Sequence, residues 1–138
     1  MKTTISVINL LALVLVLNSG IYAQKKQHIV LKGTDLIIPF SGAVTDSSNW
    51  EKLGKEALMN VEKLICSNKD YEVMSFTVIV AIGKATVETT SSSKYWAPKI
   101  KETISQLNSG DKVWIEGISV RGSDGKVKML RNVVFRIK

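Results

Sequence analysis

The sequence predicts an α+β fold, a β-rich, sandwich-like module in which an antiparallel sheet of about five or six strands carries two packed helices. Three observations lead to this prediction. Residues 71–82 alternate as a β-strand does, two other stretches repeat apolar residues at the helical period, and residues 109–138 contain two apolar segments joined by a turn. The elements are justified below in chain order.

The N-terminal residues have the layout of a secretory signal peptide. Lys2 provides a positive start, Val7–Leu17 is almost entirely apolar, and Ala23 is a small residue suited to cleavage. The apolar run is shorter than the roughly 20 residues that span a bilayer. We therefore expect cleavage of the signal peptide 1–23, one exported domain over 24–138 with no stable membrane span, and a periplasmic or extracellular location.

Two short apolar segments near the start of the expected domain predict strands. They are His28–Leu31 and Leu36–Phe40, separated by a polar Lys-Gly-Thr-Asp stretch. Pro39 has no N–H to donate to a neighbouring strand, so we expect the second segment at a sheet edge or at a bulge.

The stretch that begins at Ser48 predicts the longer helix. Ser48 and Glu51 match the capping box, in which each side chain accepts a hydrogen bond from a backbone N–H at the helix start. Glu51 and Lys55 are spaced for a weak ion pair, and the polar residues 67–68 end the pattern. The apolar residues at helical spacing are Trp50, Leu53, Ala57, Leu58, Val61, Leu64 and Ile65. This stripe is expected to pack on a sheet.

Residues 71–82 give the clearest strand pattern in the chain. Both faces of this strand are largely apolar, which predicts a central position covered on both sides. Gly83 and Lys84 predict a two-residue turn, because glycine takes a positive φ without strain. The partner strand is expected over residues 85–90.

A shorter helix is predicted over residues 96–107. Pro98 is tolerated because it lies in the first turn, and Gly110 is expected to end the helix in the left-handed conformation. The apolar stripe consists of Trp96, Ile100, Thr103, Ile104 and Leu107. Both Trp50 and Trp96 are therefore expected in the core.

The final hairpin predicts a bulge. Val113 and Ile115 have one parity and Ile118 and Val120 the other, so the buried face must change at Gly117. After the Gly122–Gly125 turn, the inward-facing residues are expected to be Val133, Phe135 and Ile137.

The same parity argument predicts an interaction surface on this hairpin. Trp114 has the opposite parity from its buried neighbours and is expected to be exposed and to contact a partner. The basic residues on the parity opposite to the inward-facing residues predict a basic outer face: Lys126, Lys128, Arg136 and Lys138.

The inventory of reactive residues argues against an enzyme. The only histidine, His28, lies in a polar lead-in, and the only cysteine, Cys66, is expected to be a small buried side chain. Zinc prefers several Cys or His ligands, Asp124 is explained by turn chemistry, and Asp111 and Glu116 would point to opposite faces of a regular strand. We therefore expect no catalytic residues, no metal and no cofactor.

The charge of the chain favours anionic neighbours. It has 19 Lys and Arg against 12 Asp and Glu, a net charge of +7, which suits lipopolysaccharide or acidic glycans. The basic residues form no long run and are not interleaved with aromatic residues, so nucleic acid is not expected as a partner.

A series of segments in the second half of the chain has the order and spacing of a known domain. They are the core-strand entry Tyr71–Val78, the helix that ends at Leu107, the Gly110–Ile118 strand, the Gly122–Gly125 turn, Leu130, and the terminal Ile137 and Lys138. The series resembles the C-terminal domain of GldM, the gliding-motility and secretion-motor protein of the bacterial envelope, in whose core strand a Ser-Phe-Thr-Val sequence recurs. The resemblance extends over about residues 58–138.

The resemblance implies a periplasmic module that acts in protein assembly and not in catalysis. In GldM such domains project from a membrane-anchored helix towards outer-membrane partners of the type IX secretion and gliding machinery. We expect this chain to depart from that pattern, as a form without the transmembrane bundle and the preceding periplasmic domains. It is expected to be a stand-alone exported copy with an envelope protein partner. The alternative is a small secreted binder of anionic glycan or lipopolysaccharide that uses the basic hairpin face.

Overall fold

The computed structural model describes residues 29–40 and 51–138, which form two β-sheets and two helices. The larger sheet has the order β3-β9-β7-β5-β6, with β8 also paired to β7. Its strands are β3 (Glu51–Leu53), β5 (Tyr71–Ile82), β6 (Ala85–Ser91), β7 (Lys112–Gly122), β8 (Val127–Met129) and β9 (Val133–Ile137). The smaller sheet has the order β1-β2-β4, with the strands β1 (Val30–Lys32), β2 (Asp35–Ile38) and β4 (Lys63–Cys66).

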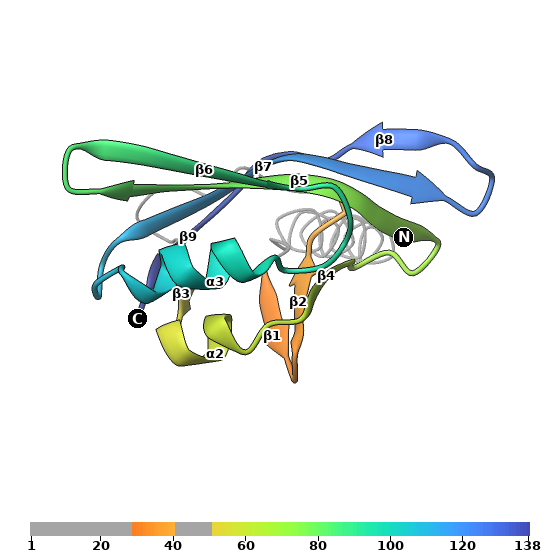
Figure 1. Ribbon diagram of the computed structural model, residues 1–138. Coiled ribbons are helices and arrows are strands. Elements are labelled where there is room, and N and C mark those ends of the chain that lie inside the picture. The colour runs from red at the N-terminus through yellow and green to blue at the C-terminus, as the bar shows by residue number, and fades with distance from the viewer. Residues whose placement is uncertain (1–28, 41–50) are drawn as a thin grey trace, which may run out of the picture.

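The two helices, α2 (Lys55–Met59) and α3 (Pro98–Ser105), lie with the smaller sheet on one side of the larger sheet (Figure 1). We call the side of the larger sheet that they cover the inner face, and the opposite side the outer face. The α+β, β-rich class is confirmed. The prediction of one antiparallel sheet needs correction, because the strands form two sheets, and β2 with β4 and β3 with β9 pair in parallel.

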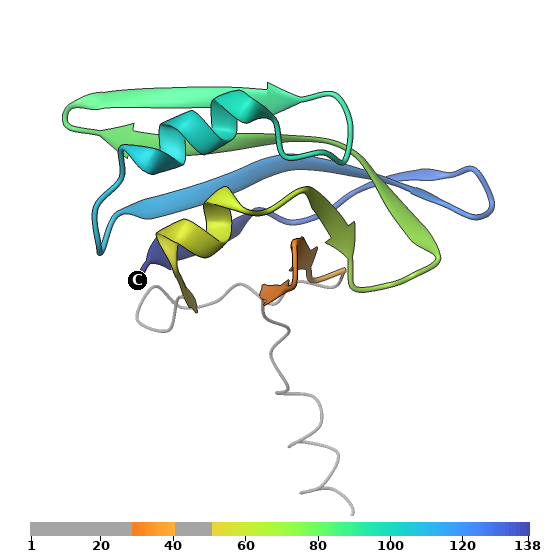
Figure 2. The ribbon, with the colours of Figure 1, turned by 60° about the horizontal axis from the view of Figure 1, so that its bottom comes forward.

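The predicted hairpin of β5 and β6 is confirmed. Seven consecutive residue pairs join the strands, from Phe76 opposite Ser91 to Ile82 opposite Ala85, and Gly83 in the turn has φ +62°. The prediction that both faces of β5 are covered is wrong. Its inner face is buried and faces α3 (Figure 2), whereas Ala81 on the outer face is exposed and no described element packs there (Figure 1).

The predicted helix over residues 48–66 is wrong in its described part. Residues 51–53 form β3, which pairs in parallel with β9, and α2 contains only five residues. The chain then returns to an extended conformation in β4, which pairs in parallel with β2. Ser48 and Trp50 lie outside the described residues, so the predicted cap is not observed. The predicted ion pair of Glu51 and Lys55 involves a side chain outside the described part of the structure, and Lys55 Nζ donates hydrogen bonds to the carbonyl oxygens of Ser105 and Leu107.

Pairing with other segments explains why the helical spacing did not produce a helix. Gly54 is extended at φ −68° and ψ 136°, and glycine disfavours a helix interior by about 1 kcal/mol. The N–H of Leu64 donates to the carbonyl of Lys94, and the N–H of Trp96 donates to the carbonyl of Glu62, each at 2.8 Å. Part of the stripe is nevertheless in the core: Leu53, Leu58, Val61 and Leu64 are buried, whereas Ile65 is half-buried and Ala57 is exposed.

The first two predicted strands are confirmed as β1 and β2, but the explanation of Pro39 needs correction. β2 is the central strand of the smaller sheet and not an edge. Pro39 follows Ile38, the last paired residue of β2, so its missing N–H costs no ladder hydrogen bond.

The shorter predicted helix is confirmed as α3, with Pro98 as its first residue. All five residues of its predicted stripe are buried, and the indole of Trp96 stacks on Phe76 with ring centroids 6.0 Å apart. Gly110 has φ +90° but lies in the turn between α3 and β7, beyond the helix end.

The predicted bulge in β7 is confirmed and has a counterpart in β5. Gly117 has φ +58°, and between Ser75 and Thr77 of β5 the partner strand β7 advances by one extra residue. A second shift in the opposite sense lies between Val73 and Ser75, so Met74 is the extra residue of β5. Both strands therefore change their buried parity at the same level of the sheet.

The core lies between the inner face of the larger sheet and the layer of α3, α2 and the smaller sheet. The largest buried side chains come from all of these elements: Phe76, Phe135, Leu36, Ile38, Leu58, Leu64, Ile100 and Ile104. The inner face is thereby occupied by packing, and the outer face is the part of the sheet left for contacts with other molecules.

Candidate functional site

The outer face carries a row of partly exposed apolar side chains centred on Trp114. Trp114 lies opposite Ile79 of β5 on one side and opposite Val134 of β9 on the other. Directly opposed residues point to the same face of a sheet, so these three side chains, which we call the Trp114 row, form one continuous strip. All three are half-buried, which leaves part of each available for contact.

A row of cations lies beside the Trp114 row on the same face. Lys112 of β7 lies opposite Arg136 of β9, and Arg136 lies opposite Lys52 of β3. We call these three residues the basic row. Arg136 Nη1 donates a hydrogen bond of 3.1 Å to the carbonyl oxygen of Gly110, which fixes the guanidinium at the end of the strand. An apolar aromatic strip next to three positive charges suits a partner surface that is partly apolar and partly acidic.

The structure separates the basic residues that parity had placed on one hairpin face. Lys128 lies opposite Val120, which is buried, so Lys128 projects from the inner face and not from the outer face. Its Nζ lies 5.5 Å from the ring centroid of Phe40 and 5.8 Å from that of Tyr71, a cation–π arrangement that ties β8 to the chain after β2. The predicted common face is therefore wrong for this residue.

The remaining basic residues lie at two opposite ends of β7. Lys126 is exposed in the turn before β8, where its N–H donates to Asp124 Oδ1 at 3.0 Å. Lys138 is exposed after β9, and its N–H donates to the carbonyl of Leu53 at 2.8 Å. Figure 1 shows β8 and the C-terminus at opposite ends of the larger sheet. Of the four basic residues predicted for the hairpin face, only Arg136 shares the outer face with Trp114.

Sequence reasoning missed Lys52 and Lys112 as neighbours of Arg136. Lys52 had been placed in a helix, and its position in β3 follows from a parallel pairing with a segment more than eighty residues away. The position of Lys112 could have been predicted from the sequence, because it has the same parity as Trp114 in β7.

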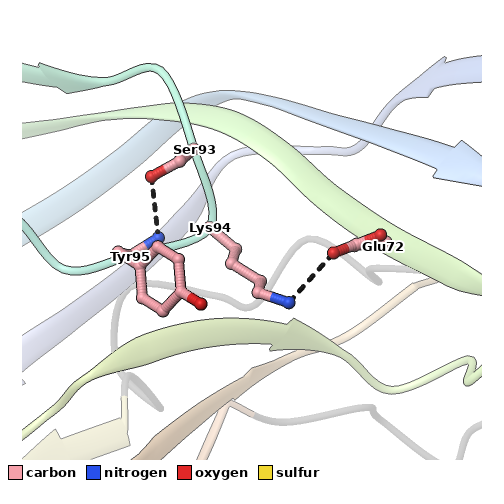
Figure 3. A network of polar contacts seen from close by, with 4 residues as sticks. All are labelled: Glu72, Ser93, Lys94 and Tyr95. Atoms are coloured by element: carbon pink, nitrogen blue, oxygen red, sulfur yellow. Dashed lines mark hydrogen bonds and ion pairs between the residues drawn. The ribbon is translucent and has the colours of Figure 1, made fainter.

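A polar cluster on the loop after β6 is the second exposed feature that the sequence did not indicate (Figure 3). Lys94 Nζ forms an ion pair of 3.0 Å with Glu72 Oε1 and lies 5.7 Å from the ring centroid of Tyr95. The hydrogen bond with Lys94 lowers the pKa of Glu72, and the same contact raises the pKa of Lys94. Both charges are satisfied by each other, so the cluster offers no proton donor or acceptor poised near neutral pH.

Cys66 is placed as a packing residue. It ends β4 opposite Ile38 and is 6% exposed. Burial raises the pKa of the Cys66 thiol, which keeps it protonated and unreactive at neutral pH. His28 lies outside the described residues.

Asp111 and Asp124, two of the three carboxylates considered in the sequence, accept hydrogen bonds within their own turns. Asp111 Oδ2 accepts a hydrogen bond of 2.7 Å from the N–H of Asn108 in the turn before β7. Across residues 29–40 and 51–138, no three His, Cys, Asp or Glu side chains are grouped as metal ligands. No helix in these two ranges has the length and apolar character needed to cross a membrane.

Comparison with protein families gives a match to the part of the chain that builds most of the larger sheet. The model of the GldM C-terminal domain matches residues 67–138. The chain belongs to the GldM C-terminal domain family. The matched region contains β5, β6, α3, β7, β8 and β9, which supply five strands of the larger sheet together with the helix that covers it. The Trp114 row thus lies entirely in the part of the chain that defines this GldM domain. No curated protein matches the sequence.

Membership in this family confirms the predicted resemblance and indicates the general role of the domain. The GldM C-terminal domain is a structural and assembly domain related to gliding motility and type IX secretion, and it is periplasmic in its parent protein. The family therefore relates this GldM domain to protein–protein contacts in an envelope machinery.

Proposed function

We propose that this GldM domain is a non-enzymatic binding and assembly module of the gliding-motility and type IX secretion machinery, exported to the periplasm or beyond. Contact with an envelope protein through the outer face of the larger sheet is the mechanism. The observation that carries the proposal is the Trp114 row, a partly exposed aromatic strip inside the family-defining region. Tryptophan is among the residues that dominate binding energy at protein interfaces.

The layering of the fold favours the outer face, and not the inner face, as the surface that contacts a partner. Most of the inner face is filled by the core, and the buried side chains there cannot reach another molecule without unfolding. On the outer face, Ile79, Trp114 and Val134 form a continuous apolar strip of the kind found at the centre of an interface. The basic row beside it supplies charges that steer an acidic partner and fix its orientation.

Crosslinking in the native envelope tests the proposal. The wild-type protein should yield a discrete crosslinked product with an envelope protein. Trp114→Ala should reduce that product several-fold, because a partly buried indole at the centre of an interface typically contributes more than about 1 kcal/mol. Tyr95→Ala is the matched control, since Tyr95 is 57% exposed but belongs to the loop after β6. A product that survives in Trp114→Ala and is lost in Tyr95→Ala would contradict the assignment of the surface.

Binding of an anionic glycan or lipopolysaccharide is the second candidate function, and the basic row favours it. Three cations in adjacent strands next to a tryptophan combine charge with a flat surface for sugar stacking. Arg136→Glu together with Lys52→Glu should abolish salt-sensitive retention on an immobilised anionic glycan, and Lys126→Glu together with Lys128→Glu should not. Equal retention of all variants excludes this function, and loss only in the second pair moves the site to β8.

A further inference from the structure

Trp114 lies between two opposite charges on the outer face. Lys112 is two residues before it in β7 and Glu116 is two residues after it, so the alternation of the strand places all three side chains on one face. Glu116 lies opposite Thr77 of β5, whose neighbours along the chain are both buried on the inner face. Each charged residue is about 6.7 Å from Trp114 along the strand, measured between Cα atoms. The Trp114 row therefore has a cation on one side and a carboxylate on the other.

A second carboxylate borders the Trp114 row at its β6 end. Glu88 lies opposite Ile79 and so extends the row by one strand. We call Glu88 and Glu116 the acidic pair. Glu88 is exposed and Glu116 is half-buried, and neither forms an ion pair with another described residue. Covering either carboxylate with a partner that places no cation opposite it would be unfavourable. A partner on the Trp114 row therefore needs positive groups at these two positions.

The two signs of charge are separated across the outer face. The basic row extends from β3 to β7, whereas Glu88 lies on β6 at the opposite margin of the larger sheet. β3 and β6 are four strand spacings apart in the sheet order, a distance of about 19 Å. The Debye length at physiological ionic strength is only about 8 Å. Each group of charges therefore acts on the part of a partner that contacts it, and the net charge of the chain does not decide what binds here.

The acidic pair works against a polyanion on this surface. A glycan or lipopolysaccharide that covered the Trp114 row would bring its own negative groups next to both carboxylates, and like charges in contact are repelled. A protein surface can carry side chains of both signs around an apolar centre. It can place carboxylates over the basic row and cations over the acidic pair at the same time. The arrangement of charges therefore favours a protein as the partner.

We propose that the outer face binds a protein surface with charges of both signs: an apolar centre over the Trp114 row, carboxylates over the basic row, and lysine or arginine over the acidic pair. This inference rests on the proposed function and deepens it, because it specifies the chemistry of the partner and its orientation. A partner rotated by 180° would set like charges opposite each other at both ends of the surface. The acidic pair thus excludes the reversed orientation, which the Trp114 row and the basic row alone would exclude less strongly.

Inverting the charges on both sides of Trp114 tests the orientation without changing the net charge. The readout is the crosslinked product with an envelope protein in the native envelope. Lys112→Glu/Glu116→Lys should reduce it by at least about 10-fold, because two attractive contacts become repulsive. Lys99→Glu/Glu102→Lys is the matched control, since both residues are exposed on α3, which covers the inner face. Urea unfolding establishes that each variant is folded. Equal products from the two inverted variants overturn the proposal.

Neutralising the acidic pair distinguishes a protein partner from a polyanion by the sign of the effect. Glu88→Gln/Glu116→Gln should reduce the crosslinked product by about 3- to 10-fold, because two favourable contacts are lost. The amides keep the shape of the side chains, so this variant remains informative if the inverted one is unstable. Glu56→Gln/Glu102→Gln makes the same change in net charge on the two helices and should leave the product unchanged. On an immobilised anionic glycan, the two double variants should elute at the same salt concentration.

The possible failures separate this inference from the proposed function. A product that is lost in Trp114→Ala but unchanged or increased in Glu88→Gln/Glu116→Gln overturns the acidic pair as a contact and leaves the proposed function intact. Stronger glycan retention of that variant than of its control overturns the inference in favour of a polyanion. Crosslinking only to a second copy of this chain overturns the assignment of the surface to an envelope partner. Absence of any product from the wild type overturns the proposed function and this inference with it.

Discussion

Replacing Gly117 by alanine should destabilise the protein through the backbone alone. Gly117 has φ +58°, and a Cβ atom at this position would meet nothing within 4 Å. The cost is therefore that of holding an L-residue in the left-handed region, about 1–2 kcal/mol. Gly117→Ala should lower the free energy of unfolding by this amount and the Tm by roughly 4–10 °C.

The open space around Gly117 makes the prediction specific. Gly117→Gln should cost about as much as Gly117→Ala, because Gly117 is exposed and the space at its Cβ position is open. Gly117→Asn should cost clearly less, since asparagine tolerates the left-handed region. Gly122→Ala provides a contrast, because there the added Cβ would lie 2.7 Å from Asp124 Oδ1 and 3.0 Å from Tyr71 Cε1.

Urea unfolding followed by tryptophan fluorescence measures these differences, with linear extrapolation and a common slope. The reasoning is refuted if Gly117→Ala is as stable as the wild type, or if asparagine destabilises more than alanine. Deletion of Gly117 is the severe form of the test. It would place Val113, Ile115, Ile118 and Val120 on one face of a regular strand, but it would leave the extra residue of β5, Met74, without its counterpart in β7 and shift the pairing of the two strands, so we expect a larger loss of stability than in Gly117→Ala.

Three further predictions concern the core and the titratable groups. Phe135→Ala should lower the free energy of unfolding by about 3–5 kcal/mol because Phe135 is fully buried; a loss below about 1 kcal/mol in urea unfolding would contradict its place in the core. Glu72 has a lowered pKa because of Lys94, so its contribution to stability is present above the ordinary glutamate pKa and is lost as the pH falls through the folded value. Thermal unfolding of Glu72→Gln should therefore show a shallower loss of stability in acid than the wild type, and identical acid profiles would show that the ion pair contributes nothing. The Cys66 thiol, whose pKa is raised by burial, should react with a thiol reagent at least about 100-fold more slowly in the native protein than in urea; equal rates would place it at the surface.

The sequence by itself determined the elements whose pattern depends on neighbouring residues along the chain. The β5–β6 hairpin follows from alternation and from a turn that needs glycine at its first position. α3 follows from a stripe at the helical period and a proline in the first turn. The bulge at Gly117 follows from the change of parity within β7, since a regular strand cannot bury both sets of residues.

Tertiary pairing decided the elements whose local pattern fits more than one structure. The apolar spacing from Leu53 to Leu64 suits a helix, but the same residues become buried when the segment is divided into β3, α2 and β4. The hydrogen bonds that β9, β2 and the loop at Lys94 offer to this segment come from distant parts of the chain. Local periodicity does not contain that information.

Only part of the candidate surface could be predicted from the sequence, because side-chain parity is fixed within a strand but not across a loop. The parity of Trp114 gave its face of the sheet, because parity holds within one continuous strand, but its side chain is half-buried and not exposed as predicted. Lys128 was not placed correctly, because the chain leaves β8 through a loop before it enters β9 and parity is not preserved across that loop. The alignment of Lys52, Arg136 and Lys112 required three strands to meet, and only the folded sheet brings them together.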